Sequence, residues 1–171
     1  NKSEYDKAFE VLNECLVLWM KLNDLINIIG IEQRIGIVAF TKGNYPLALE
    51  HFNKMKQLSV DQDASESVLE LSWSILVYLK MKNILSGGMT VENLVELVEN
   101  EDINEGDLIP LNWNMHQIFI ILKNEEEADD YLESAYLELK HQSKRIKNKN
   151  NRESFMNNIK LHKDIVKKFK S

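Results

Sequence analysis

The chain has 171 residues, of which 44% are hydrophobic and 28% charged, and its formal net charge is −6 at pH 7. This length can bury a sizeable core, and two prolines and six glycines are too few for the turns of a β-rich fold, so long helices joined by short loops are expected. A single cysteine, Cys15, excludes an intramolecular disulfide and favours a reducing, cytoplasmic compartment.

No apolar stretch approaches the roughly 20 residues that span a bilayer. Glu32 and Arg34 interrupt the most apolar region, residues 25–40, so we expect no membrane partner. The chain begins at Asn1 without an initiator methionine or a signal-peptide pattern, which predicts a fragment of a larger protein.

Helical patterning begins near the N-terminus. Residues 5–23 carry apolar side chains at helical spacing and predict one helix with a broad buried face, in which Cys15 is a small core residue. Asp24 is a good N-cap for a second helix that runs to about Lys42.

A tight turn is predicted between the second helix and its return helix. Gly43, followed by Asn44, tolerates the left-handed conformation that commonly ends a helix. Pro46 fits the first turn of the return helix, 46–58, where its missing N–H would have no partner anyway. Small residues occur where the two helix backbones must approach each other: Gly36, Ala39 and Ala48.

Three further features are predicted in the middle of the chain. A polar turn over 60–64 precedes a long helix over 65–82, and the loop 83–89 is expected to be the most flexible internal segment because it contains two adjacent glycines. The possible caps of the long helix are Asp61, Asp63 and Ser65. Thr90 is expected to cap a short helix from 91 to about 98, before an acidic loop over 101–106.

The apolar pattern repeats along the chain with a period of about 40 residues, and we call its copies the repeat series. The first two copies are Tyr5, Ala8, Leu12 and Cys15, then Tyr45, Ala48, Phe52 and Met55. A further copy, two periods beyond the second, is Glu125, Ala128, Leu132 and Ala135. Regular repetition of this kind indicates stacked helical hairpins that bury one another's apolar faces.

The hairpin 34–52 resembles a tetratricopeptide (TPR) repeat, whose pattern is matched by Gly36, Gly43, Tyr45, Ala48 and Phe52. The longer period resembles the long-helix TPR variants of large bacterial signalling and regulatory proteins. The resemblance implies one all-α solenoid domain over 1–171, with about eight antiparallel helices. It further implies a non-catalytic scaffold or regulatory segment, without a cofactor, that binds a peptide or protein partner on its concave face.

From residue 108 onward the chain resembles the closing segment of TPR regions in multidomain bacterial proteins that carry ATPase, cyclase or kinase domains. The matching residues are Pro110, Leu111, Trp113, Ala128, Leu132, Ala135, Tyr136, Leu139, Ile146, Arg152, Phe155, Asn158 and Ile165. In that family Arg-x-x-Phe begins the last helix. Lys160 and Ser143 depart from the family's usual proline and alanine.

The resemblance also indicates which residues would meet a partner. First helices line the concave face of TPR arrays, and three corresponding positions on them, each one period apart, are Gln33, Trp73 and Trp113. An alternative interpretation is that both tryptophans pack between repeats, because Trp burial is strongly favourable. The predicted partner-binding residues are Gln33, Ile37, Trp73, Trp113, Asn114 and Gln117, with Asn112 as a further polar candidate.

The C-terminal part suggests an alternative function. Residues 140–171 contain eleven Lys or Arg residues and two acidic ones, Glu153 and Asp164, which leaves nine net positive charges. Such a segment could bind nucleic acid electrostatically. The interpretation that we favour is a solvated Lys-rich surface on a final helix whose inward residues are Phe155, Ile159, Ile165, Val166 and Phe169.

No catalytic or metal-binding motif is recognisable in the sequence. The histidines lack a metal-ligand spacing such as His-Glu-x-x-His and are expected to be isolated surface residues. They are His51, His116, His141 and His162. We therefore do not expect this protein to be an enzyme.

Overall fold

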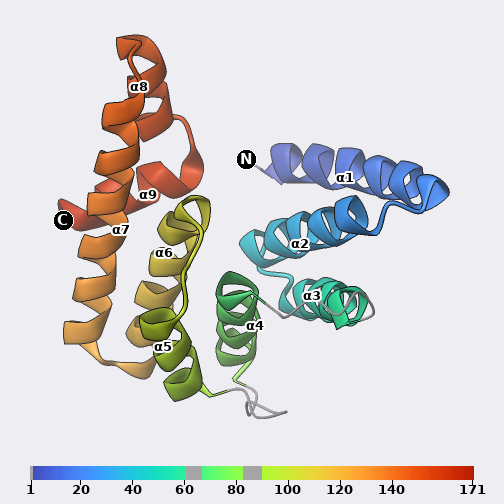
Figure 1. Cartoon of the computed structure of the whole chain (residues 1–171), viewed down its shortest axis with the longest axis horizontal. Helices are drawn as coiled ribbons and strands as arrows, with labels where there is room; N and C mark the ends of the chain where they lie inside the picture. The colour runs from blue at the N-terminus through green and yellow to red at the C-terminus, as the bar shows by residue number, and fades with distance from the viewer. Residues whose placement is uncertain (1, 61–66, 83–89) are drawn as a thin grey trace. The chain divides into compact units, whose positions relative to one another are not determined.

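A computed structural model describes residues 2–60, 67–82 and 90–171, and this part of the chain is all-α, as predicted (Figure 1). Its helices form two compact units, 1–90 and 91–171, which we call the N-terminal and C-terminal units. The N-terminal unit contains α1 (Lys2–Leu22), α2 (Leu25–Thr41), α3 (Tyr45–Val60) and α4 (Val68–Lys80). The C-terminal unit contains α5 (Val91–Asn100), α6 (Glu105–Leu122), α7 (Glu125–Arg145), α8 (Lys149–Asn157) and α9 (Lys160–Phe169).

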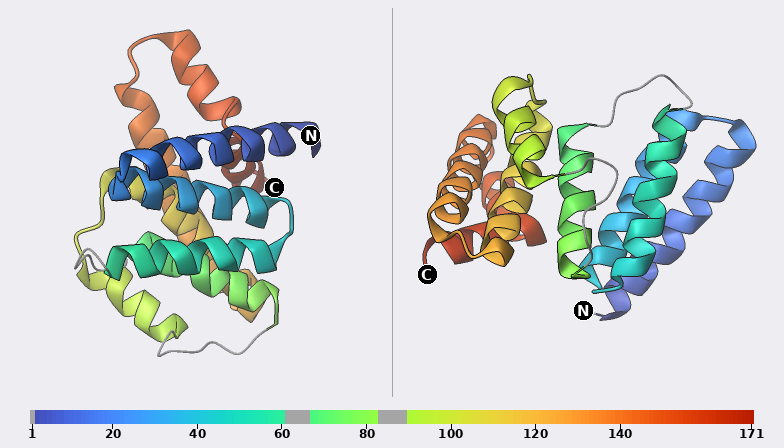
Figure 2. Two further views of the ribbon diagram at one scale, coloured as in Figure 1. Left: turned by 90° about the vertical axis from the view of Figure 1, so that its right-hand side faces the viewer. Right: turned by 90° about the horizontal axis from the view of Figure 1, so that it is seen from below.

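In the N-terminal unit, α2 lies between α1 and α3 (Figures 1 and 2). Trp73 of α4 connects this layer to the fourth helix: its ring centroid lies 5.3 Å from that of Phe40 on α2 and 6.2 Å from that of Phe52 on α3. The apolar faces of three helices therefore meet around one pair of stacked aromatic rings.

The boundaries of α2 follow the predicted signals. The Asp24 carboxylate accepts a hydrogen bond from the backbone N–H of Asn27 at 3.1 Å, and hydrogen bonds from Asn27 lower the pKa of Asp24. At the other end Gly43 has φ +79°, and the N–H of Asn44 donates to the carbonyl of Ala39 at 2.9 Å. The predicted cap and turn are confirmed at both ends.

The predicted close approach of α2 and α3 is confirmed at Gly36. A Cβ added there would lie 2.5 Å from Cε1 of Phe52, a distance that real Cβ contacts do not reach. Gly36 and Phe52 are both buried, and so are Ala39 and Ala48. Glycine at this position allows the Phe52 ring to lie directly on the α2 backbone.

Helix α4 begins later than predicted, at Val68 instead of Ser65. Its N-cap is Ser67, whose hydroxyl accepts from the N–H of Glu70 while the Glu70 carboxylate accepts from the N–H of Ser67. The predicted caps at 61–65 and the predicted loop at 83–89 lie outside the described residues.

The C-terminal unit is built on the antiparallel pair α6 and α7 (Figure 1). The acidic loop is shorter than expected, because α6 already begins at Glu105. Asn124 caps α7 by accepting from the N–H of Glu127 at 3.4 Å. One hydrophobic cluster joins α6, α7 and α9, and its buried members are Ile109, Leu132, Ala135, Leu139 and Ile165.

The predicted single final helix is wrong, because the structure has two, and the described part of the chain contains nine helices in place of about eight. Ile159 has extended backbone angles, φ −79° and ψ 121°, which end α8 and start α9. Its side chain is 44% exposed, although it was expected to face inward. Of the other residues expected to face inward, Ile165 is buried, whereas Phe169 is 39% exposed and stacks on Tyr136 with ring centroids 4.1 Å apart.

The prediction of surface histidines is wrong for three of the four. His51, His116 and His162 are buried, because each lies on the apolar face of its helix and bonds an acceptor there. His116 Nδ1 is 2.8 Å from the carbonyl oxygen of Ala128, which links α6 to α7. His162 Nδ1 is 2.8 Å from the carbonyl oxygen of Phe155, which links α9 to α8, and burial lowers the pKa of His162.

Among the described helices, none is both long and apolar enough to cross a lipid bilayer.

Candidate partner-binding groove

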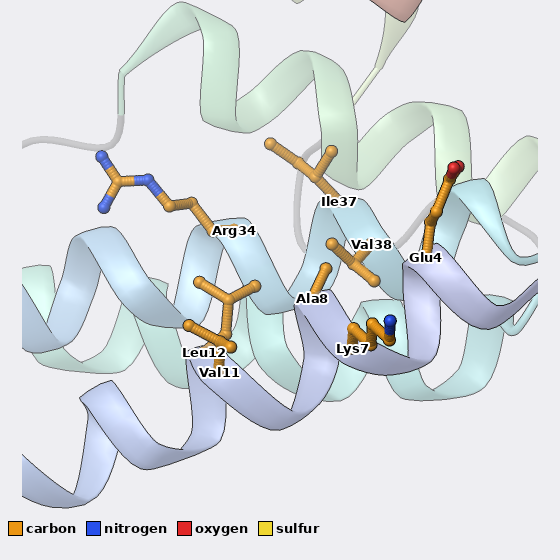
Figure 3. A pocket seen from close by; sticks show the side chains of 8 residues that line it. All are labelled: Glu4, Lys7, Ala8, Val11, Leu12, Arg34, Ile37 and Val38. Carbon is orange, nitrogen blue, oxygen red and sulfur yellow. The ribbon is translucent and has the colours of Figure 1, made fainter. Parts of the chain in front are cut away.

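An apolar groove of about 640 Å³ lies between α1 and α2 (Figure 3). We call it the α1–α2 groove. Its apolar lining residues are Ala8, Val11, Leu12, Ile37 and Val38, and its charged ones are Glu4, Lys7 and Arg34. Val11 is 56% exposed even though it is an aliphatic side chain in a helix–helix layer. The groove therefore presents apolar surface that the described chain does not cover.

Charged side chains border the groove at both ends. Arg34 lies toward the end that holds Val11 and Leu12, and Glu4 and Lys7 lie toward the other (Figure 3). Lys7 and Arg34 are exposed, and neither forms an ion pair with another described residue. Glu4 and Lys7 carry opposite charges at one end, and Arg34 is a cation at the other, so charges of both signs border the apolar floor.

Corresponding residues of the repeat series are less buried on α1 than on α3 and α7. In the copies on α3 and α7 the apolar side chains are buried: Ala48, Phe52 and Met55, and Ala128, Leu132 and Ala135. In the first copy Ala8, Leu12 and Cys15 of α1 remain partly exposed. Cys15 is therefore only partly buried and not the fully buried core residue that was predicted.

Ile37 is the predicted partner-binding residue that lines the groove. Gln33, one turn earlier on α2, is partly exposed and does not line it. Trp73 is only 8% exposed and packs on Phe40 and Phe52, so it offers a partner little surface. The contacts of Trp73 agree with the interpretation in which the tryptophans pack in the interior.

The remaining predicted residues belong to α6 in the C-terminal unit. Trp113 packs against the cluster around Ile109 and Leu132, and its ring centroid lies 5.3 Å from that of His116. Asn114 is 0% exposed, which removes it from any partner surface in this conformation, because the helix turns its side chain into the interior. Gln117 and Asn112 are partly exposed.

The basic C-terminal segment forms several ion pairs within the chain. Arg145 binds the carboxylate of Glu105, Lys160 Nζ lies 3.0 Å from Asp164, and Lys149 Nζ lies 3.9 Å from Glu153. The hydrogen bond from Arg145 lowers the pKa of Glu105. Glu153 and Asp164 are already counted in the nine net positive charges of the segment, so the acidic partner in these three pairs that balances further charge is Glu105.

One side-chain cluster was not foreseen from the sequence, because Glu105 is far along the chain from Glu138 and His141. Ligand atoms of Glu105, Glu138 and His141 all lie within 4.8 Å of one another. His141 Nδ1 is 3.9 Å from the Glu105 carboxylate and 3.6 Å from that of Glu138. Arg145 binds the same Glu105 carboxylate and competes with a cation for it.

The α1–α2 groove is accordingly the best-formed candidate for a partner site. It combines open apolar surface with bordering charges, and it includes Ile37, which the sequence had indicated. Comparison of the chain with protein-family models, with curated proteins and with solved structures finds no match.

Proposed function

We propose that this chain is a non-catalytic protein-interaction module, a TPR-like helical repeat that acts as a scaffold or regulatory segment in the cytoplasm. The observation that carries the proposal is the α1–α2 groove, where Val11, Leu12 and Ile37 leave apolar surface uncovered. Uncovered apolar surface bordered by charge is typical of sites that bind other proteins.

The repeat series supports the same proposal. Its small and large apolar residues recur at the same spacing on α1, α3 and α7. Gly36 and Phe52 form the close helix contact that such a hairpin requires. Helical repeats of this kind use exposed side chains of their helices to bind partners, while the rest of each helix maintains the stack.

A peptide-display selection on the whole folded chain tests the proposal. We expect the selection to converge on related peptides, because an open apolar surface with fixed charges favours particular sequences. Ile37→Glu should lower the affinity of the selected peptides by about tenfold or more, since it places a charge in the apolar lining. The affinities are measured by fluorescence anisotropy.

Leu137→Glu is the matched control, because Leu137 is exposed on α7 and lies outside the α1–α2 groove. Selected peptides should bind this variant as they bind the original chain. A selection that yields no convergent peptide from the folded chain would contradict the proposed interaction function.

A further inference from the structure

We propose that Glu105, Glu138 and His141 form a binding site for a divalent transition-metal ion such as Zn²⁺. We call these three residues the metal triad. The triad belongs to the C-terminal unit, so the inference does not depend on the α1–α2 groove or on the proposed interaction function.

The packing of α6 on α7 brings the three side chains together. Glu105 is the first residue of α6, and Glu138 and His141 lie near the end of α7. Because the two helices are antiparallel neighbours, the start of α6 lies beside the end of α7 (Figure 1). The spacing Glu-x-x-His puts both α7 side chains on the same face of that helix. The ligand set is therefore fixed by two helices.

The donor atoms are spaced so that one ion can be shared among them. His141 Nδ1 lies 3.6 Å from Oε1 of Glu138 and 3.9 Å from Oε1 of Glu105, and one ligand atom from each residue lies within 4.8 Å of the others. Two ligands at about 2.0–2.2 Å from one tetrahedral zinc ion are roughly 3.4 Å from each other. Small side-chain rotations would bring all three ligands onto one ion.

The imidazole distinguishes the metal triad from an ordinary cluster of acidic side chains. A neutral ring nitrogen is a good ligand for zinc and other transition-metal ions, whereas calcium and magnesium take oxygen ligands. Two carboxylates supply the charge that balances a divalent ion, and water can fill the remaining position. A Glu-x-x-His element joined by a glutamate from a facing helix is a ligand arrangement that recurs in helical-bundle metal sites.

The metal triad is accessible from solvent and is partly positioned in advance. The side chains of His141 and Glu105 are 63% and 47% exposed, and that of Glu138 is 18% exposed. Gln142 Nε2 donates at 2.9 Å to Oε1 of Glu138 and at 2.9 Å to the backbone carbonyl oxygen of Glu105. Gln142 is thus a positioning residue that ties Glu138 to the start of α6.

Arg145 already places a positive charge at the metal triad, because its guanidinium donates to Oε1 of Glu105. A carboxylate has acceptor positions on both oxygens, so Glu105 can bind an ion as well, against electrostatic repulsion from Arg145. Removal of the Arg145 charge should therefore strengthen metal binding, whereas removal of a ligand should weaken it.

Calorimetric titration of Zn²⁺ into the full chain without an affinity tag tests the site. We expect saturable binding of one ion. His141→Ala and Glu105→Gln should each lower the affinity by about tenfold or more, because each removes one of three protein ligands. Both side chains are exposed, so both variants should fold, which circular dichroism checks. Absent binding, or binding that both substitutions leave unchanged, would overturn the inference.

Glu133→Gln is the matched control for the loss of a carboxylate. Glu133 is exposed on α7 and lies outside the metal triad. This substitution removes the same charge as Glu105→Gln, so a general attraction of cations to the acidic surface would be reduced in both variants. The inference predicts unchanged affinity for Glu133→Gln. Equal losses in the two variants would show diffuse cation binding only and would overturn the site.

Arg145→Met reverses the expected direction of change. It should raise the affinity for Zn²⁺ by about threefold or more, because a cation next to Glu105 is removed. Lys144→Met is its control, since Lys144 is an exposed neighbour of the same charge. No gain in Arg145→Met, or an equal gain in Lys144→Met, would overturn the assignment of Glu105 as a ligand.

Thermal unfolding gives a readout that does not depend on the heat of binding. An ion that binds the folded chain should raise its melting temperature. We expect this rise for the original chain and for Glu133→Gln, and we expect it to be lost in His141→Ala. A rise of equal size in His141→Ala would place the ion elsewhere on the chain and would overturn the proposed site.

Discussion

Phe52→Ala is expected to lower the free energy of unfolding of the N-terminal unit by about 3–5 kcal/mol. Phe52 is almost fully buried, lies against the backbone of Gly36 and stacks on Trp73. Its removal leaves a cavity at the point where α2, α3 and α4 meet. Chemical denaturation followed by circular dichroism and by tryptophan fluorescence measures the loss.

A compensating substitution makes this prediction specific to the α2–α3 crossing. In the original chain, Gly36→Leu should be destabilising, because even a Cβ at Gly36 would collide with the Phe52 ring. In the Phe52→Ala background the same leucine enters the cavity and should restore part of the lost stability. Additive effects of the two substitutions would show that the side chains are not in contact.

Phe169→Ala is the control of matched residue type. Phe169 is 39% exposed at the end of α9, and its one described ring partner is Tyr136. This substitution should lower the free energy of unfolding by about 0.5–1.5 kcal/mol, the contribution of a single aromatic pair. Equal losses for Phe52→Ala and Phe169→Ala would contradict the central position assigned to Phe52.

His51→Leu is expected to lower the free energy of unfolding by about 3–5 kcal/mol, through a different mechanism. His51 Nδ1 on α3 is 2.5 Å from the carboxylate of Glu32 on α2, and both side chains are buried. Without the imidazole the carboxylate stays buried and loses its hydrogen bond. Denaturant titration measures this loss.

A double-mutant cycle tests whether the two groups act as a pair. His51→Leu combined with Glu32→Leu removes both polar groups and should recover most of the stability that either single change loses. Glu32→Gln keeps an oxygen that accepts from the imidazole and should cost less than Glu32→Leu. If the losses of the two leucine variants simply add, the hydrogen bond does not contribute to the stability of the fold.

The sequence predicts the α2–α3 hairpin well because its signals are local. Asp24 at the start of α2, Gly43 at its end and Gly36 at the crossing each act through their own backbone geometry or size. Ser67 could also have been found, since Glu70 three residues later completes a capping box. Polar residues shortly before Ser67 are also possible N-caps, which is why the start of α4 was predicted too early.

Features that depend on a distant neighbour were less predictable. Ala8, Leu12 and Cys15 have the same spacing as the buried residues of α3, and only the structure shows that they stay partly exposed. Asn114 resembles a surface amide in sequence but faces the interior of the C-terminal unit. The break at Ile159 has no glycine or proline to mark it.

The central claim is that the apolar residues of the repeat series are less buried on α1 than on α3 and α7, and thiol labelling tests it most directly. Cys15 is compared with thiols introduced by Met55→Cys or Ala135→Cys, each combined with Cys15→Ser, and every rate is divided by that of the same chain unfolded in denaturant. Both introduced thiols replace fully buried side chains, whereas Cys15 is partly exposed. We predict that Cys15 reacts more than about tenfold faster than either of them. Equal protection of all three thiols would contradict the claim.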